Sequence, residues 1–167
     1  QVEVQNRVTG ENYFESYDKL ILSPGAEPLR PPIPGIEEKN IFTLRNVKNT
    51  FDIEGYIGNR DCKNAVVVGG GFIGLEMAEN LHHRGLKVTI VEMADQVMAP
   101  LDYEMAAIIH EYLKTKDIEL VLKDGVKSFG QEDESIFVEL ESGAKLKTDL
   151  VILAIGVRPE TALAESA

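Results

Sequence analysis

Hydrophobic residues in the middle of the chain alternate between strand-like and helix-like spacing. A short apolar run over residues 65–68 precedes three glycines and a helical stretch that ends at Arg84 and Gly85. Apolar side chains four positions apart give this stretch one buried face, and a cation followed by glycine is typical of a helix C-terminus. We therefore expect a strand, a glycine turn and a helix over residues 65–85.

The same alternation continues to residue 122. Strands are predicted over residues 88–91 and 118–122, and Asp102 can cap a helix between them. That helix has apolar residues at the i, i+3, i+4, i+7 and i+8 positions, namely Met105, Ile108, Ile109, Tyr112 and Leu113. The order β-α-β-α-β predicts parallel strands joined by right-handed crossovers. These segments indicate an α/β fold with a Rossmann-like parallel sheet.

Two further strand patterns follow. Over residues 126–147 the hydrophobic period falls to two, and Ser142 and Gly143 mark a tight turn, so we expect an antiparallel β-meander. Residues 150–155 are continuously apolar, as in a central strand that is covered on both faces. The meander and the last strand complete the predicted Rossmann-like domain.

The first part of the chain has a different character. Residues 1–22 predict a hairpin whose second arm includes the apolar run 20–22. Five prolines between residues 23 and 35 exclude a helix or a central strand and indicate a stiff linker. A short strand over 41–44 and a helix over 46–56 are expected to follow.

An internal repeat relates the two ends of the chain. Residues 18–28 and 149–159 share an Asp, an Ile, a Leu, a Gly and a Pro at a constant offset of 131, and both follow a hairpin. Chance similarity is one explanation. The alternative is that residues 18–28 close one nucleotide-binding domain and residues 149–159 close a second, complete one. The chain also begins with Gln1 rather than Met, so we expect an excised piece of an enzyme that binds two nucleotides.

The glycine turn carries the clearest chemical signal. Gly69, Gly71 and Gly74 fit the pattern G-x-G-x-x-G, with Phe72 and Ile73 between the last two glycines. The pattern alone is weak, but here it follows an apolar strand and opens an amphipathic helix, as in dinucleotide-binding folds. The first glycine allows the turn, the second lets backbone N–H groups approach a pyrophosphate, and the third lets helix and strand pack closely. A tight βα turn without a ligand is the competing interpretation.

Glu92 stands at the end of the next predicted strand, 18 residues after Gly74. An acidic residue at about this spacing accepts hydrogen bonds from the adenosine ribose, although it could also be a solvated carboxylate. The three residues after Glu92 are Met93, Ala94 and Asp95, which include no Arg or Lys that would attract a 2′-phosphate, so NAD(H) is favoured over NADP(H). Glu76 is expected in the first turn of the helix, where the helix dipole alone could favour it.

The segments 66–79 and 151–159 resemble those of the FAD-dependent pyridine nucleotide-disulfide oxidoreductases. Residues 79–85 and 94–102 are most similar to coenzyme A-disulfide reductases, NADH-dependent persulfide reductases and related NADH oxidases. The resemblance implies an FAD domain, an inserted NAD domain and a dimerisation domain, with hydride passing from NADH through flavin to a small disulfide or persulfide. It also implies a homodimer of the full-length enzyme. On this basis residues 1–45 are the tail of the FAD domain and a linker, residues 46–161 the NAD(H)-binding domain, and residues 162–167 the return to the FAD domain.

The family resemblance also suggests individual roles. Phe72 resembles the aromatic gate over the flavin, although its side-chain type is more often core. Glu76 resembles the acidic residue that contacts the nicotinamide carboxamide, and Ile155 and Gly156 resemble the backbone segment beside the nicotinamide. No catalytic residue is expected within this chain, because the flavin fingerprint and the redox cysteine of the family are missing from it. The isolated chain should therefore bind nucleotide without turnover.

Composition narrows the alternatives. With 17 Lys and Arg against 28 Asp and Glu, the formal charge of −11 argues against nucleic acid or an anionic membrane as a partner. No apolar stretch approaches the roughly 20 residues that span a bilayer. A single cysteine, Cys62, fits a reducing cytoplasm, and no Cys or His spacing resembles a metal site. We interpret the three histidines, His82, His83 and His110, as surface or packing residues.

Three rival functions remain open. One is a ferredoxin or rubredoxin reductase type of flavoprotein, which uses the same domains without a redox cysteine. Another is a stand-alone nucleotide-binding module. The third is that the glycine turn binds FAD rather than NAD(H).

Overall fold

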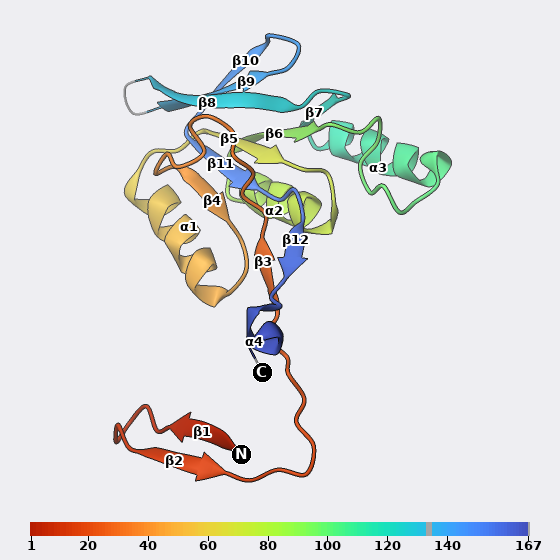
Figure 1. Cartoon of the computed structure of the whole chain (residues 1–167). Helices are drawn as coiled ribbons and strands as arrows, with labels where there is room; N and C mark the ends of the chain where they lie inside the picture. Colours follow the sequence, from red (N-terminus) through yellow and green to blue (C-terminus); the bar gives the residue numbers. More distant parts are fainter. Residues whose placement is uncertain (133–134, 167) are drawn as a thin grey trace. The chain divides into compact units, whose positions relative to one another are not determined.

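The computed structural model describes residues 1–132 and 135–166 and divides them into two compact units. Residues 26–158 form the larger unit (Figure 1). The smaller unit comprises the remaining described residues at both ends of the chain, with a hairpin and a short helix: β1 (Val2–Gln5), β2 (Asn12–Glu15) and α4 (Ala162–Glu165). The larger unit begins at Ala26, whereas the sequence suggested a domain boundary after residue 45; the assignment of domains stays a prediction.

A five-stranded parallel sheet is the centre of the larger unit, in the order β4-β11-β5-β6-β7. The Rossmann-like fold expected from the sequence is thus confirmed. Its strands are β4 (Ile41–Thr43), β5 (Asn64–Val68), β6 (Lys87–Glu92), β7 (Glu119–Leu122) and β11 (Leu150–Leu153). The helices that connect them are α1 (Val47–Asn59), α2 (Phe72–His83) and α3 (Tyr103–Thr115).

The predicted antiparallel meander is also present, as β8 (Val126–Glu132), β9 (Ser135–Leu140) and β10 (Lys145–Thr148). It covers one face of the parallel sheet, and the three helices lie on the other face (Figure 1). This arrangement explains why β5 and β11 are apolar at successive positions. Ala65 and Val67 pack in the core on the helix side, while Val66 and Val68 pack against the meander.

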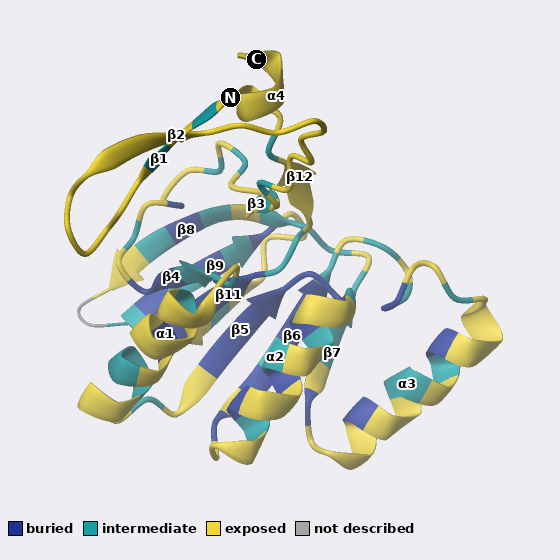
Figure 2. Cartoon of the chain, turned by 90° about the horizontal axis from the view of Figure 1, so that it is seen from below, coloured by how far each residue is buried: buried dark blue, intermediate teal, exposed yellow. Residues whose placement is uncertain are grey.

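Burial decreases outward from these central strands. Figure 2 shows β5 buried along most of its length and α3 exposed over much of its surface. Among α3 residues, Ala106 and Leu113 are buried, whereas Ile108 and Tyr112 keep 63% and 52% of their surface exposed. No helix within the described ranges has the length and apolar character needed to cross a membrane.

One expectation about local structure is wrong. The run Leu20–Leu22 is not a strand, and Ile21 is 87% exposed, because no other described strand pairs with it. Its repeat counterpart does form a strand, because β11 pairs with β4 and β5. The predicted linker contains a short strand, β3 (Ala26–Pro28), that pairs with β12 (Val157–Pro159). The last three residues of the first copy of the repeat therefore pair with the last three residues of the second copy in one small sheet.

Candidate nucleotide-binding site

The candidate site lies where the parallel strands reach their carboxyl ends. β5 is the central strand, with β6 on one side and β11 on the other. Because the chain leaves β5 for β6 in one direction, and β11 and β4 lie in the other, this edge is the topological switch point at which open α/β sheets bind ligands. The glycine turn after β5, the end of β6 and the segment after β11 all meet at this edge.

Two glycines of the turn are required by the packing of the protein itself. Gly69 has φ +107°, and a Cβ there would lie 2.4 Å from the carbonyl oxygen of Ala154. A Cβ on Gly74 would lie 1.9 Å from the carbonyl oxygen of Gly69. The first contact brings the turn against the end of β11, and the second brings α2 against the turn. Any larger side chain at these positions must push the elements apart.

Gly71 differs from both. It is the N-cap of α2 with φ −80°, a conformation open to any residue, and a Cβ there would meet no atom within 4 Å. Neither packing nor backbone strain in the described chain calls for glycine at this position. Open space at a helix N-terminus, beside unpaired backbone N–H groups, is the arrangement that lets a phosphate approach closely.

The side chain of Glu92 is held against the glycine turn. Its Oε2 accepts a hydrogen bond from the backbone N–H of Gly70 at 2.7 Å, and its Oε1 accepts one from the N–H of Ala94 at 2.8 Å. A carboxylate has about four acceptor sites, so further hydroxyl donors can still bind it. The two features that the sequence linked only by spacing are joined here by a direct bond.

The loop after β6 supports the turn from the other side, and the sequence patterns did not reveal this. The N–H of Met98 donates to the carbonyl oxygen of Gly70 at 2.8 Å, and Met98 adopts φ +53°. The side chain of Val97 is fully buried beside Gly70, where a Cβ would lie 2.7 Å from Val97 Cγ1. Gly70 is therefore fixed by Glu92, Val97 and Met98 together.

The remaining predicted residues surround the first turns of α2 and the end of β11. Phe72 is 67% exposed and Ile73 40% exposed, so Phe72 is not a core residue. Glu76 is also exposed, and the first helical turn contains no acidic residue, because α2 begins at Phe72. The expected place of Glu76 in that first turn is wrong; it lies one turn further.

The segment after β11 contributes Ile155 and Gly156. Ile155 is half-buried and packs against the core on the meander side. Gly156 has φ +114°, and its carbonyl oxygen accepts the N–H of Leu29 at 3.0 Å. This bond attaches the end of the segment to Leu29, the residue directly after β3.

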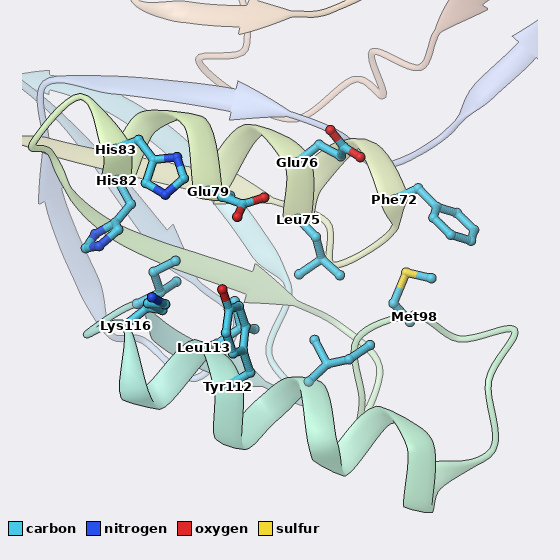
Figure 3. A pocket seen from close by; sticks show the side chains of 12 residues that line it. Phe72, Leu75, Glu76, Glu79, His82, His83, Met98, Tyr112, Leu113 and Lys116 are labelled. Carbon is cyan, nitrogen blue, oxygen red and sulfur yellow. The ribbon is translucent and has the colours of Figure 1, made fainter.

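A hollow of about 260 Å³ lies between α2 and α3. Figure 3 shows Phe72 and Met98 near the start of α2, and His82, His83 and Lys116 near the other end of the groove. Phe72 and Glu76 are among its lining residues, but the glycines of the turn, Glu92, Ile155 and Gly156 are not. The hollow therefore runs between α2 and α3, and only the end that is lined by Phe72 and Met98 lies beside the glycine turn.

Cys62 lies between α1 and β5, at the amino end of the strand. The five residues of β5 separate it from the glycine turn by about 16 Å. Burial raises the pKa of its thiol, and the neighbouring Asp149 carboxylate raises it further. Within the described ranges, no cluster of three or more His, Cys, Asp or Glu side chains could hold a metal ion.

Because the thiolate is the reactive form of cysteine, the raised pKa predicts a sluggish Cys62. At pH 7 we expect it to react with Ellman's reagent more slowly than free cysteine does, and its alkylation to leave nucleotide affinity unchanged. The thiol assay and a titration of the alkylated chain measure these two quantities. Reaction faster than that of free cysteine would show that the thiol is activated, contrary to this prediction.

The chain is similar to known proteins along almost its whole length. The family model described as pyridine nucleotide-disulphide oxidoreductase matches residues 1–167. A protein of Methanocaldococcus jannaschii named NADH oxidase is 42% identical over 161 residues, which are 95% of this chain and 35% of that protein.

Two solved structures extend the comparison. The reduced CoADR-RHD of Bacillus anthracis is 54% identical with a TM-score of 0.89, over 99% of this chain and 29% of that one. An engineered water-forming NADPH oxidase, made from the Lactobacillus brevis enzyme and bound to NADPH, is 28% identical with a TM-score of 0.84, over 98% of this chain and 36% of that one. The chain thus spans about a third of the length of the relatives it matches.

Proposed function

We propose that this chain, which belongs to the pyridine nucleotide-disulphide oxidoreductase family, is the NAD(H)-binding part of a flavin-dependent oxidoreductase. One observation carries the proposal: the Glu92 carboxylate is bonded to Gly70 beside an open position at Gly71. This arrangement supports the proposal, because a dinucleotide needs an acceptor for its ribose hydroxyls next to a helix N-terminus that can bind its phosphates.

Each part of the nucleotide then has a place on the carboxyl edge. The pyrophosphate lies over Gly71 at the N-terminus of α2, where the backbone N–H groups and the helix dipole favour negative charge. The hydroxyl groups of the adenosine ribose donate hydrogen bonds to the Glu92 carboxylate. The nicotinamide lies toward Phe72, Ile73, Glu76, Ile155 and Gly156, as the family resemblance implies.

NADH supplies a hydride when bound, and the residues of this chain bind and orient the nucleotide. We propose that the complete protein contains FAD and passes the reducing equivalents to a small disulfide, a persulfide or oxygen. Relatives named coenzyme A disulfide reductase, persulfide reductase and NADH oxidase support this choice of acceptors. We further propose a cytoplasmic homodimer with no nucleic-acid or membrane partner.

The choice of NADH over NADPH depends on Glu92. The engineered oxidase that binds NADPH carries an aspartate replaced by alanine and the next residue replaced by arginine, 18 positions after a glycine-to-alanine change. Glu92 and Met93 follow Gly74 at the same spacing here. A carboxylate at this point repels a 2′-phosphate, whereas arginine would pair with it.

Glu92→Arg should therefore weaken NADH binding by about 10- to 100-fold, the value of one or two charge-assisted hydrogen bonds, and strengthen NADPH binding. Calorimetric titration of the chain with both nucleotides measures the two changes. Improved NADPH affinity would also show that the variant site is intact.

Glu119→Arg provides a matched control. Glu119 is exposed and is the first residue of β7, at the amino edge of the sheet, and its replacement makes the same change in charge. It should alter both affinities little, because the candidate site lies at the opposite, carboxyl edge of the sheet. If Glu92→Arg left both affinities unchanged, the ribose would not bind at Glu92, and the proposed site would be wrong.

A further inference from the structure

The imidazole of His110 is in direct contact with the loop that supports the glycine turn. His110 lies on α3, where its ring packs edge-on against the ring of Tyr103 with the centroids 6.3 Å apart. Its Nε2 accepts a hydrogen bond from the backbone N–H of Val97 at 3.2 Å. To accept, Nε2 must be unprotonated, so the imidazole is neutral and its single proton is on Nδ1.

Val97 transmits this contact to the nucleotide site. Its side chain is fully buried against Gly70, and the next residue, Met98, donates its N–H to the Gly70 carbonyl oxygen at 2.8 Å. Gly70 in turn donates its own N–H to Glu92. A continuous series of contacts therefore runs from His110 through the loop to the carboxylate that is proposed to bind the ribose.

We propose that His110 is a positioning residue of the nucleotide site, and that its neutral form holds the loop at residues 95–98 against the glycine turn. The inference rests on the proposed function, because it assigns His110 an effect on NADH affinity. An imidazolium carries N–H groups on both nitrogens and has no lone pair for Val97. Protonation therefore replaces a hydrogen bond by two opposed donors and releases the loop, which weakens nucleotide binding.

Other charged groups do not replace His110 in this role. On α3, Lys114 is one turn further along the same face, and on the loop Asp95 is two residues before Val97. Among the described residues, the His110 imidazole forms no ion pair with a carboxylate. The contacts that face it are the Val97 N–H and the neutral Tyr103 ring.

The test is a calorimetric titration of the chain with NADH between pH 6.0 and 8.5. For the unmodified chain we expect the affinity to fall by up to about tenfold toward the acid end, the value of a lost hydrogen bond with its donor left unpaired. His110→Gln retains a neutral acceptor that does not titrate, so its affinity should stay close to the value at pH 8.5 throughout. His110→Phe provides no acceptor and should bind about tenfold more weakly at every pH.

His83→Gln is the matched control, because His83 is an exposed histidine on α2; it should keep the pH dependence of the unmodified chain. Thermal unfolding followed by circular dichroism identifies any variant that fails to fold, and His110→Gln then decides the question. The proposal is overturned if the unmodified chain shows no pH dependence, or if His110→Gln shows the same dependence. Failure of the unmodified chain to bind NADH at any pH would instead overturn the proposed function, and this inference with it.

Discussion

Gly71→Ala is expected to lower NADH affinity by about 100-fold or more while the chain folds normally. A methyl group at this position meets no protein atom within 4 Å, and φ −80° suits alanine. Helix N-caps favour glycine over alanine, so the unfolding free energy should fall by no more than about 1 kcal/mol. The methyl group would instead occupy the space of the pyrophosphate and remove about two charge-assisted hydrogen bonds to the turn, each worth about tenfold or more in affinity.

Nucleotide titration and chemical denaturation of the same preparation separate the two effects. Gly58→Ala is the matched control, since Gly58 lies in α1 and a Cβ there also meets nothing within 4 Å. It should leave NADH affinity unchanged and raise stability slightly, because alanine is the better helix former. If Gly71→Ala bound NADH as tightly as the unmodified chain, the nucleotide would not approach the turn at Gly71.

The sequence was sufficient to predict those parts of the site that depend on local spacing. Gly69, Gly71 and Gly74 lie within six residues, and Glu92 ends the next strand, so the strand–turn–helix order alone places them at one edge of the sheet. The motif also assigns the three glycines different roles, but it does not give the contacts that separate them. In the structure, a Cβ on Gly69 or Gly74 would meet a backbone carbonyl oxygen, whereas a Cβ on Gly71 would meet open space.

The supporting contacts depend on pairs that are far apart in the chain. Val97 lies against Gly70 across 27 residues, and its N–H meets an imidazole 13 residues further on. No hydrophobic period relates these positions, so the sequence pattern does not predict the contact between His110 and Val97. The contact with Val97 shows that its ring has a defined partner.

Strand formation also depended on partners that the sequence pattern does not contain. The apolar run at residues 20–22 resembles its counterpart at 151–153, yet only the second is a strand. A backbone in a sheet needs neighbours on which to place its N–H and C=O groups. Leu150–Leu153 has such neighbours on both sides, in β4 and β5, and the first run has none among the described strands.

Gly69→Ala should mainly lower the stability of the fold, whereas Gly71→Ala should mainly lower the affinity for NADH. At φ +107° any residue with a Cβ is strained by about 1–3 kcal/mol. In addition, the new Cβ would lie 2.4 Å from the Ala154 carbonyl oxygen, so the turn and the end of β11 must separate. Together these costs should remove about 3 kcal/mol or more of stability, a large share of the 5–15 kcal/mol typical of a domain.

Thermal unfolding followed by circular dichroism measures this loss, which corresponds to a decrease in melting temperature of about 10 °C for a chain of this size. Excess NADH should raise the melting temperature of both the unmodified chain and Gly69→Ala, since a ligand that binds only the folded state stabilises that state. In Gly71→Ala the same NADH concentration should produce little stabilisation, although that variant melts near the unmodified temperature. Equal melting temperatures for Gly69→Ala and the unmodified chain would mean that β11 and the turn are not in contact, and that the geometry of the whole carboxyl edge is wrong.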